Sequence, residues 1–546
     1  MKRQLIIATA ALCCLGAQAQ ETYESAKLIN EDLNGTARYV GMGGAMEALG
    51  ADISTMGSNP AGIGLFRRSN VSASAGLVTQ NGAEDFADTK KTNLSFDQIG
   101  FVYSMRSSKR SFINFGFNYH KSKNFDQILS AAGRINGASQ NKLSYVKGAA
   151  GVFDEVRYGT TSSDGSFHDV TPGSGNGAWL GVNRYGSGYY ESGAFNQADY
   201  LYYNVFLADN TANTFYYEDA TAYDMKRGSH GYIGEYDFNL SGNSKDRFYW
   251  GVTFGLHDVH YNDASSYIET LDASDGGATE LVDERRITGT GFDIKAGVIF
   301  RPVATSPFRV GLYVHTPTWY DLTTTNSTTL AYSSQTGGAS GQISDSYDFK
   351  FFTPWKFGIS LGHTIGTQIA LGATYEYADY GTADIRVNDG GYYDYWGSYV
   401  ETSSSDDAMN DNVKKVLRGV STLKLGMEFK PTSNLALRLG YNYVSPQYSS
   451  DGYKDGTIES YGNYYASTTD YTNWKATNRL TAGVGYTHKN WNVDLAYQYS
   501  RTEGDFSPFM SYYPGSGDDA DLKNVPDGCT VKNIRQQLVL TLGYRF

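Results

Sequence analysis

Few side chains in this sequence are spaced for metal binding. His257 and His260 could share a zinc ion if both lay on one face of an element. They fall in a segment of alternating polarity, however, and residues three apart on a strand point to opposite faces, so we expect no shared metal. Asp518, Asp519 and Asp521 could bind Ca²⁺ weakly, but a solvated acidic loop is the simpler interpretation.

Two Gly-Ser-Gly segments, at 186–188 and 515–517, place a serine between glycines, as nucleophile elbows do. A nucleophile elbow needs a strand before it and a helix after it, and neither segment has that context. We therefore predict no catalytic residue, no metal site and no cofactor, and we expect that the protein is not an enzyme.

Composition limits the class of protein. The formal net charge is −12, which argues against a nucleic-acid partner, because such binders concentrate Lys and Arg. No apolar run reaches the roughly 18 residues of a membrane helix. The chain has 45 Tyr and 62 Gly but only 11 Pro, and aromatic residues make up 14%. This balance favours many β-strands and argues against disorder.

Residues 1–19 have the pattern of a secretory signal peptide. A positive pair, Lys2 and Arg3, precedes the apolar run Leu5 to Leu15, and Ala17-Gln18-Ala19 forms a small-x-small cleavage site. We predict cleavage after Ala19 and export of the mature chain.

The cysteines leave one alternative for this segment. A lipoprotein signal would use Cys13 or Cys14, but neither follows the small residues expected before a lipidated cysteine. Cleavage after residue 19 leaves only Cys529, so we expect no internal disulfide.

The rest of the chain repeats one signal, an alternation of apolar and polar residues over about ten positions. Phe292, Ile294 and Ala296 alternate with Asp293 and Lys295, for example. We predict fourteen strands near 69–80, 96–106, 111–120, 231–241, 247–261, 287–301, 308–319, 345–363, 368–380, 420–429, 435–444, 479–488, 491–501 and 533–546.

Three features favour a membrane barrel over a soluble sandwich. The polar face carries full charges, aromatic residues gather near segment ends, and the connections alternate in length. Six are tight turns, and seven are long: 81–95, 121–230, 262–286, 320–344, 381–419, 445–478 and 502–532. The sequence therefore predicts an all-β fold, a 14-stranded antiparallel transmembrane β-barrel at 69–546.

The chain ends on aromatic residues of the last predicted strand, Tyr544 and Phe546. Such endings resemble the signal that is read by the machinery that inserts barrels into the bacterial outer membrane. We predict this location, with the lipid bilayer and that machinery as partners and a monomeric protein.

Residues 20–68, which we call the hatch, precede the first strand and lack its alternation. Eight glycines between Asn34 and Phe66 permit tight turns and close backbone approach. Because an unblocked barrel of fourteen strands would leak, we predict that this segment plugs the lumen.

The hatch carries the segment Asn59-Pro60-Ala61, which resembles the hatch motif of the long-chain fatty-acid transporter (FadL/TodX) family of outer-membrane proteins. The segment 36–45 also resembles that hatch, and 315–320 resembles Bacteroidetes-type members. The resemblance covers nearly the whole mature chain, because the strand count matches as well.

The resemblance implies passive uptake of hydrophobic small molecules, with long-chain fatty acids as the expected class. A ligand, or detergent in its place, is expected to land in a groove of the extracellular loops and to enter a lumen pocket. A rearrangement of the hatch then releases it. In the family a kink in the third strand opens a lateral exit, and Gly116 is the candidate for that kink here.

The connection 121–230 is too long to lack structure. Leu201, Tyr202, Val205 and Phe206 recur at helical spacing, and Asn196 is a plausible N-cap. These four residues are our candidate hydrophobic ligand groove, and a small core that holds the loop together is the alternative. A second short helix is expected around Met409, Val413, Val416 and Leu417.

Three other functions stay open at this point. A barrel of this kind could act as a protein-docking component of a secretion shuttle, or as a haem-binding outer-membrane receptor. An outer-membrane hydrolase is the enzyme alternative. The sequence offers no haem-ligand pair and no catalytic constellation that favours the last two.

Overall fold

The computed structural model describes residues 9–10, 20–172, 177–209, 214–274, 276–515 and 519–546. Most of the predicted signal peptide, Asp518 and part of the segment 515–517 lie outside these residues. A two-residue strand, β1 (Thr9–Ala10), pairs with β17 (Gly338–Phe352). Among the described residues, no helix is long and apolar enough to cross a membrane.

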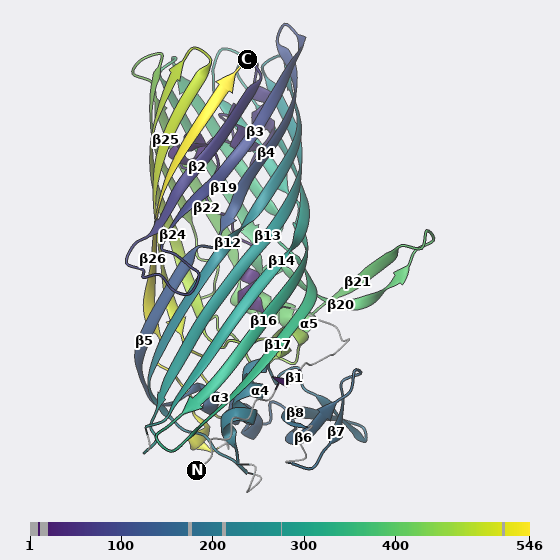
Figure 1. Cartoon of the computed structure of the whole chain (residues 1–546). Coiled ribbons are helices and arrows are strands. Elements are labelled where there is room, and N and C mark those ends of the chain that lie inside the picture. Colours follow the sequence, from purple (N-terminus) through teal and green to yellow (C-terminus); the bar gives the residue numbers. More distant parts are fainter. Residues whose placement is uncertain (1–8, 11–19, 173–176, 210–213, 275, 516–518) are drawn as a thin grey trace.

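The fold is a closed barrel of fourteen antiparallel strands (Figure 1), as predicted. The last strand pairs with the first, Asn70 opposite Arg545, which closes the wall. In order of pairing the strands are β2 (Asn70–Gln80), β3 (Thr92–Ser108), β4 (Ser111–Asn124) with β5 (Gln127–Ala138), β12 (Ala220–Ser244), β13 (Phe248–Leu271), β14 (Ala278–Phe300), β15 (Arg309–His315) with β16 (Trp319–Ser333), β18 (Lys356–Ile365) with β17, β19 (Ile369–Asp379), β22 (Gly419–Phe429), β23 (Leu435–Val444), β24 (Tyr471–His488), β25 (Trp491–Ser507) and β26 (Cys529–Arg545).

Three of these strands are interrupted. β4 gives way to β5 at 125–126, β15 to β16 at 316–318, and β18 is separated from β17 by 353–355. Pro317 and Pro354 lie in two of the breaks, where a residue without a backbone N–H costs no ladder hydrogen bond. The barrel wall is therefore irregular at these three breaks.

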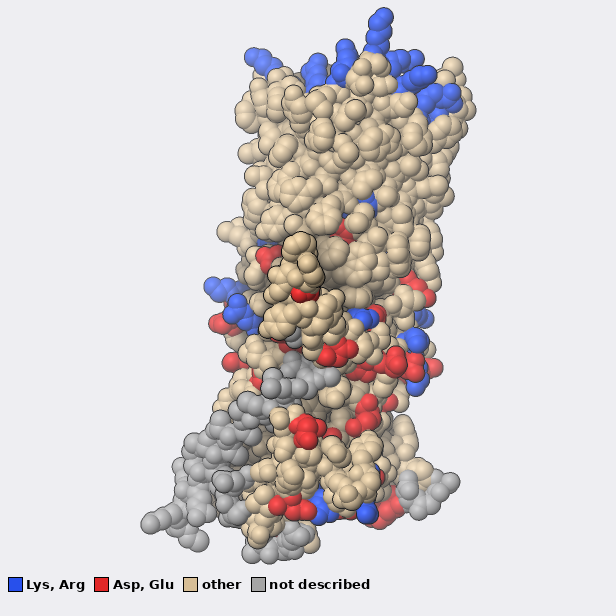
Figure 2. Space-filling view, turned by 90° about the vertical axis from the view of Figure 1, so that its right-hand side faces the viewer, with Lys and Arg blue, Asp and Glu red and all other residues tan. Residues whose placement is uncertain are grey.

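The outside of the barrel has two zones (Figure 2). On the face shown, the half next to the short turns is almost free of charge and ends in a row of Lys and Arg, whereas acidic and basic side chains are frequent in the half next to the long connections. Large apolar side chains such as Phe238 and Leu312 point outward and are about half exposed. An apolar band above short turns is typical of outer-membrane barrels, in which the short turns face the periplasm.

Two of the predicted long loops are wrong. The segments 262–286 and 320–344 are mostly strand, because β13 and β14 are joined by 272–277 and β16 and β17 by 334–337. These hairpins project beyond the apolar band. Their outward face meets water, and their inward face is buried against the hatch and the loop segments. The sequence there is rich in Asp, Glu, Ser and Thr and loses the alternation on which the strand prediction depends.

The hatch lies inside the barrel and contains four short helices: α1 (Thr22–Ala26), α2 (Ala37–Gly41), η1 (Ile53–Met56) and η2 (Pro60–Leu65). Almost all its residues are buried, although it has little regular structure. Close approach to the wall explains its glycines: a Cβ on Gly43, whose φ is +62°, would lie 2.8 Å from the backbone N of Tyr441.

The connection between β5 and β12 packs its helices at the barrel mouth and projects a small sheet to one side (Figure 1). Four short strands form a closed sheet in the order β6-β7-β9-β8. The elements are α3 (Gln140–Ala149), β6 (Glu155–Thr161), β7 (Ser166–Asp169), β8 (Ala178–Tyr185), β9 (Gly188–Glu191), α4 (Gln197–Tyr202), η3 (Tyr203–Leu207), β10 (Ala208–Asp209) and β11 (Thr214–Phe215).

The other long connections carry a projecting hairpin and short helices. The hairpin is β20 (Asp384–Tyr393) with β21 (Tyr399–Ser405). The predicted helix near Met409 is confirmed as α5 (Asp407–Val416). The remaining elements are η4 (Tyr380–Thr382), α6 (Tyr461–Tyr464) and η5 (Ala520–Leu522).

Candidate functional site

The Asn-Pro-Ala segment starts the helix η2 and fixes the hatch against the wall. The side chain of Asn59 caps the helix, its Oδ1 accepting from the backbone N of Ala61 at 3.1 Å, and Pro60 takes the first turn, where no N–H is needed. A Cβ on Gly297 would lie 2.0 Å from Asn59 Oδ1, and one on Gly251 would lie 2.4 Å from the carbonyl of Pro60. The lack of side chains at these glycines of β13 and β14 thus lets the segment pack directly against the barrel wall.

Two cavities lie on opposite sides of the hatch. One, of about 490 Å³, is lined by Arg38 and Ile53 and lies next to the short turns, since Lys430 and Asn434 also line it. The residues that directly follow in the chain, Tyr39 and Ser54, line a cavity of about 90 Å³ on the other side. Here the hatch is a partition only one residue layer thick.

Polar contacts join this partition to the wall. Arg38 pairs with Glu428 of β22 at 3.1 Å and donates to the carbonyl of Ala51 at 3.0 Å. The hydroxyl of Tyr39 donates to Glu47 at 3.1 Å, and Glu47 pairs with Lys424 at 2.9 Å. Around α2 the hatch therefore depends on hydrogen bonds and ion pairs and has only small apolar clusters, whereas Tyr23, Leu28 and Ile29 near α1 belong to a large one.

A third cavity, of about 210 Å³, continues from the one of 90 Å³ toward the loops. Aromatic side chains form much of its wall: Tyr23, Phe125, Tyr261, Tyr448, Tyr471 and Trp474. Charged side chains line it as well, six of them basic and four acidic: Lys27, Lys123, Arg227, Lys475, Arg479, Arg535, Glu24, Glu31, Asp32 and Asp470. The cavity therefore combines an aromatic part with a densely charged part.

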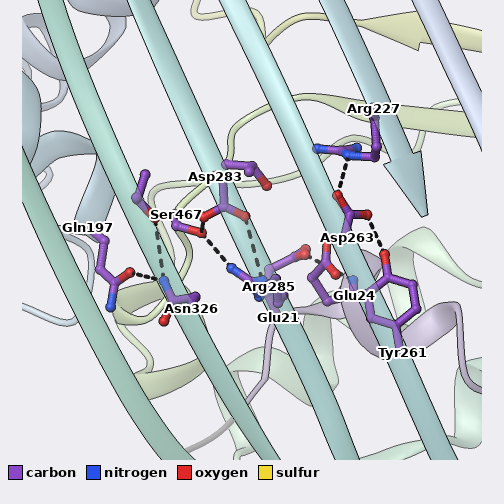
Figure 3. Close-up of polar contacts among 12 residues, drawn as sticks. Glu21, Glu24, Gln197, Arg227, Tyr261, Asp263, Asp283, Arg285, Asn326 and Ser467 are labelled. Carbon is purple, nitrogen blue, oxygen red and sulfur yellow. Dashed lines mark hydrogen bonds and ion pairs between the residues drawn. The ribbon is translucent and has the colours of Figure 1, made fainter. Parts of the chain in front are cut away.

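On one side of this cavity, the charges neutralise one another (Figure 3). Arg227 of β12 pairs with Asp470 at 2.8 Å and with Asp263 of β13 at 3.3 Å, and the hydroxyl of Tyr261 donates to Asp263 at 2.5 Å. Beside them, Ser467 bridges Arg285 and Asp283, with both distances 2.5 Å. This side holds α1 in place and has no cation to spare.

On the other side, three cations surround one carboxylate. Arg479 and Arg535 each approach Asp32 to 3.5 Å, and Lys123 donates to the neighbouring Asn30. Burial opposes ionisation of Asp32, but Lys123, Arg535 and Arg479 together lower its pKa to about 2. Two positive charges remain in excess, so this corner can attract the anionic group of a ligand.

Sequence reasoning missed these three cations. They come from β4, β24 and β26, and only the register of the closed barrel brings them together. Arg479 and Arg535 lie in predicted strands, on whose polar faces charged residues are expected, whereas Lys123 lies in the predicted connection 121–230 and had no such signal.

The predicted loop groove is buried in the core. Asn196 caps α4 as predicted, with a full capping box. Leu201, Tyr202 and Phe206 are at most 3% exposed, and Val205 packs against the same cluster. The residues fill the barrel mouth with other loop side chains, which is the arrangement of the alternative interpretation.

The predicted kink at Gly116 is wrong. Gly116 pairs with Val102 and with Asn239 in unbroken ladders. Its hydrogen makes room for the hatch, because a Cβ there would lie 2.2 Å from the Cε of Met56. The irregularity in β4 lies further along, at Ser122, where the register with β12 shifts.

The ladder between β3 and β4 ends near that irregularity. Their described pairing runs from Ser108 only to Gln98, and a register shift of β3 at Asp97 lies beside it. The side chain of Asn34 from the hatch donates to Asp97 and to the carbonyl of Lys121, both at 3.2 Å. Hatch and wall therefore meet where two adjacent strands separate.

The remaining predicted residues have clear positions. His257 is 6% exposed and faces the lumen, whereas His260 faces outward and contacts Asp258 at 2.9 Å, so the two histidines do point to opposite faces. Tyr544 pairs with Val71 in the closing ladder, and Phe546 is 62% exposed at the chain end.

Comparisons with known proteins give structural neighbours only. No known family profile matches the chain, and no curated protein matches it in sequence. The toluene transporter TbuX of Ralstonia pickettii is 13% identical, with a TM-score of 0.46 over 94% of this chain and 99% of that one. The toluene transporter TodX of Pseudomonas putida is 13% identical, with a TM-score of 0.45 over 94% of this chain and 99% of that one. A FadL homologue of Pseudomonas aeruginosa is 11% identical, with a TM-score of 0.46 over 95% of this chain and 100% of that one. The solved structures to which this chain is similar thus include members of the FadL/TodX family that its hatch resembles.

Proposed function

We propose that the protein is an outer-membrane channel for passive uptake of hydrophobic small molecules, with long-chain fatty acids as the substrate class. The observation that carries this proposal is the cavity above the hatch, which combines an aromatic wall with two unneutralised positive charges around Asp32. An alkyl chain would lie along Tyr448 and Trp474, and its carboxylate would approach Arg479 and Arg535.

The hatch supplies the step that follows binding. Because Arg38 and Tyr39 line different cavities, a small displacement of α2 would join the two. The other route that the resemblance implies, a lateral exit into the membrane, would lie where β3 separates from β4, beside Asp97 and Ser122. Neither route needs an energy source, since both run down a concentration gradient.

Binding of a fluorescent polyene fatty acid to the purified barrel in detergent tests the proposal. Competition by a saturated fatty acid and by the uncharged alcohol of equal length separates the two parts of the cavity. We expect Arg479→Gln with Arg535→Gln to weaken the acid at least tenfold and to leave the alcohol within twofold. Arg501→Gln is the control, because Arg501 is an exposed arginine on the neighbouring strand β25. This change should leave the binding of both the acid and the alcohol unaltered.

Two results would overturn the proposal. One is a wild-type protein that binds neither ligand. The other is a double variant that loses acid and alcohol equally, which would mean that the cations hold the fold and do not select an anionic group.

A further inference from the structure

A second buried polar cluster lies in the lumen wall, apart from the ligand cavity. It consists of His120 on β4, Glu235 and Asp237 on β12, His257 on β13, and Asp293 and Lys295 on β14. All except His120 are at most 6% exposed. The ladder places them side by side, because Glu235 pairs directly with His120 and with His257.

Lys295 neutralises only one side of this cluster. Its Nζ lies 2.5 Å from Oε1 of Glu235, 2.9 Å from Oδ1 of Asp293 and 3.5 Å from Oδ1 of Asp237. One ammonium thus faces three carboxylates, which leaves two negative charges when the imidazoles are neutral. Uncompensated buried charge is strongly unfavourable, so a further positive charge is expected here.

The other carboxylate oxygens face the two histidines. Oδ2 of Asp237 lies 3.5 Å from Nδ1 of His120, and Oε2 of Glu235 lies 3.6 Å from Nε2 of the same ring and 4.0 Å from Nδ1 of His257. Nε2 of His257 lies 3.4 Å from Oδ2 of Asp293. Among the described residues, none forms a hydrogen bond of good geometry with Oδ2 of Asp237 or with either ring nitrogen of His257. Unsatisfied polar atoms so deeply buried indicate a missing partner.

The spacing suits a metal ion. Ligand atoms of His120, Glu235 and Asp237 all lie within 4.8 Å of one another. With metal–ligand bonds of about 2.1 Å, two ligands of a tetrahedral ion lie about 3.4 Å apart. The separations of 3.5 and 3.6 Å involve different nitrogens of His120, and only one of these can bind the ion. The three ligand atoms that lie within 4.8 Å of one another must therefore approach by up to about 1.4 Å to reach the tetrahedral spacing.

We propose that His120, Glu235 and Asp237 bind one divalent transition-metal ion, with His257 as a fourth ligand. Mixed imidazole and carboxylate ligands favour Zn²⁺, Mn²⁺ or Fe²⁺ over Ca²⁺ and Mg²⁺. The ion would supply the two missing charges and tie three neighbouring strands together. It would also lie behind the hatch, because a Cβ on Gly57 would come within 2.9 Å of the His120 ring and 3.4 Å of Asp237.

The test uses the full-length barrel in detergent, stripped with a chelator and dialysed against Zn²⁺. Elemental mass spectrometry should find one equivalent of zinc, and Co²⁺ in its place should give the visible absorption of a low-symmetry nitrogen and oxygen site. We expect His120→Gln and Asp237→Asn each to weaken zinc binding at least tenfold.

His260→Gln is the matched control, since this histidine lies on the same barrel but faces outward. It should bind zinc as the wild type does. Heat-dependent mobility on a gel confirms that each variant is folded, so a lost site is distinguishable from a lost barrel. Less than a tenth of an equivalent in the folded wild type, or equal losses in His260→Gln, would overturn the proposal. Fatty-acid binding can fail without affecting this result.

Discussion

Replacing Arg38 by Ala should open the partition between the two cavities. The change removes the ion pair with Glu428 at 3.1 Å and the hydrogen bond to the Ala51 carbonyl at 3.0 Å. A hydrogen bond to a charged group contributes about 1.5–3 kcal/mol and one to a carbonyl about 0.5–1.5 kcal/mol. Both hold α2 against its surroundings.

The net effect is smaller than the sum of these two contributions. The Arg38 side chain is 22% exposed, so water recovers part of the loss, and Glu428 keeps Arg438 at 2.8 Å. We therefore expect the closed state of the hatch to lose about 2 kcal/mol of stability. This loss corresponds to about a 30-fold rise in the ratio of open to closed hatch.

Ion conductance in a planar bilayer measures that ratio. Arg38→Ala should raise the time spent in a conducting state about 30-fold over the wild type, in keeping with the free energy above. Arg501→Ala, which removes an exposed pair with Glu503 outside the partition, should leave conductance unchanged. A folded Arg38→Ala barrel that stays as closed as the wild type would refute the idea that contacts of α2 hold the partition.

Three further predictions concern the hatch and the loop unit. Gly116→Ala should destabilise the barrel by about 1–3 kcal/mol because its Cβ meets Met56, and adding Met56→Ala should restore the urea midpoint; a loss that persists in the double variant would contradict the steric reason. Asn59→Ala removes the cap of η2 and should cost about 1 kcal/mol, seen as faster proteolysis of the hatch, while unchanged proteolysis would mean that the cap contributes nothing. Burial raises the pKa of Glu191 to about 7 against the hydrogen bond from Tyr464, so the neutral form is favoured in the folded loop unit. The unfolded carboxyl ionises near its ordinary pKa of 4.5, so stability is full below pH 4.5 and falls as the pH rises to about 7; Glu191→Gln should make proteolysis of the loop unit independent of pH over this window, and an unaltered pH profile would count against it.

The barrel could be predicted because its membrane band imposes a strict pattern on the sequence. Lipid on one side and a polar lumen on the other force alternation, so a segment such as 435–444 has the same bounds in the prediction and in the structure. Above the band the outward face meets water, and the buried inward face includes polar residues such as Asp283 and Glu269, so the pattern ends although the strands continue. The extension of β13 to Leu271 and the start of β14 at Ala278 therefore lie outside the predicted strands.

The candidate site could be predicted only in its local part. The capping and proline geometry of Asn59 and Pro60 is a matter of adjacent residues, and the sequence displays it. The three cations around Asp32 and the cluster around Lys295 depend on which residues face each other across the lumen or between strands. A shift of two residues in the register of one strand would separate them, and a single sequence does not fix that register.

The most direct measurement is a crystal structure of the barrel with a fatty acid that carries bromine on its terminal carbon. We predict an anomalous bromine peak inside the lumen, near Tyr448 and Trp474, with the carboxylate beside Arg479 and Arg535. Bromine found only on the outer apolar band, with the lumen cavity filled by water alone, would mean that the barrel does not take up its ligand through the lumen.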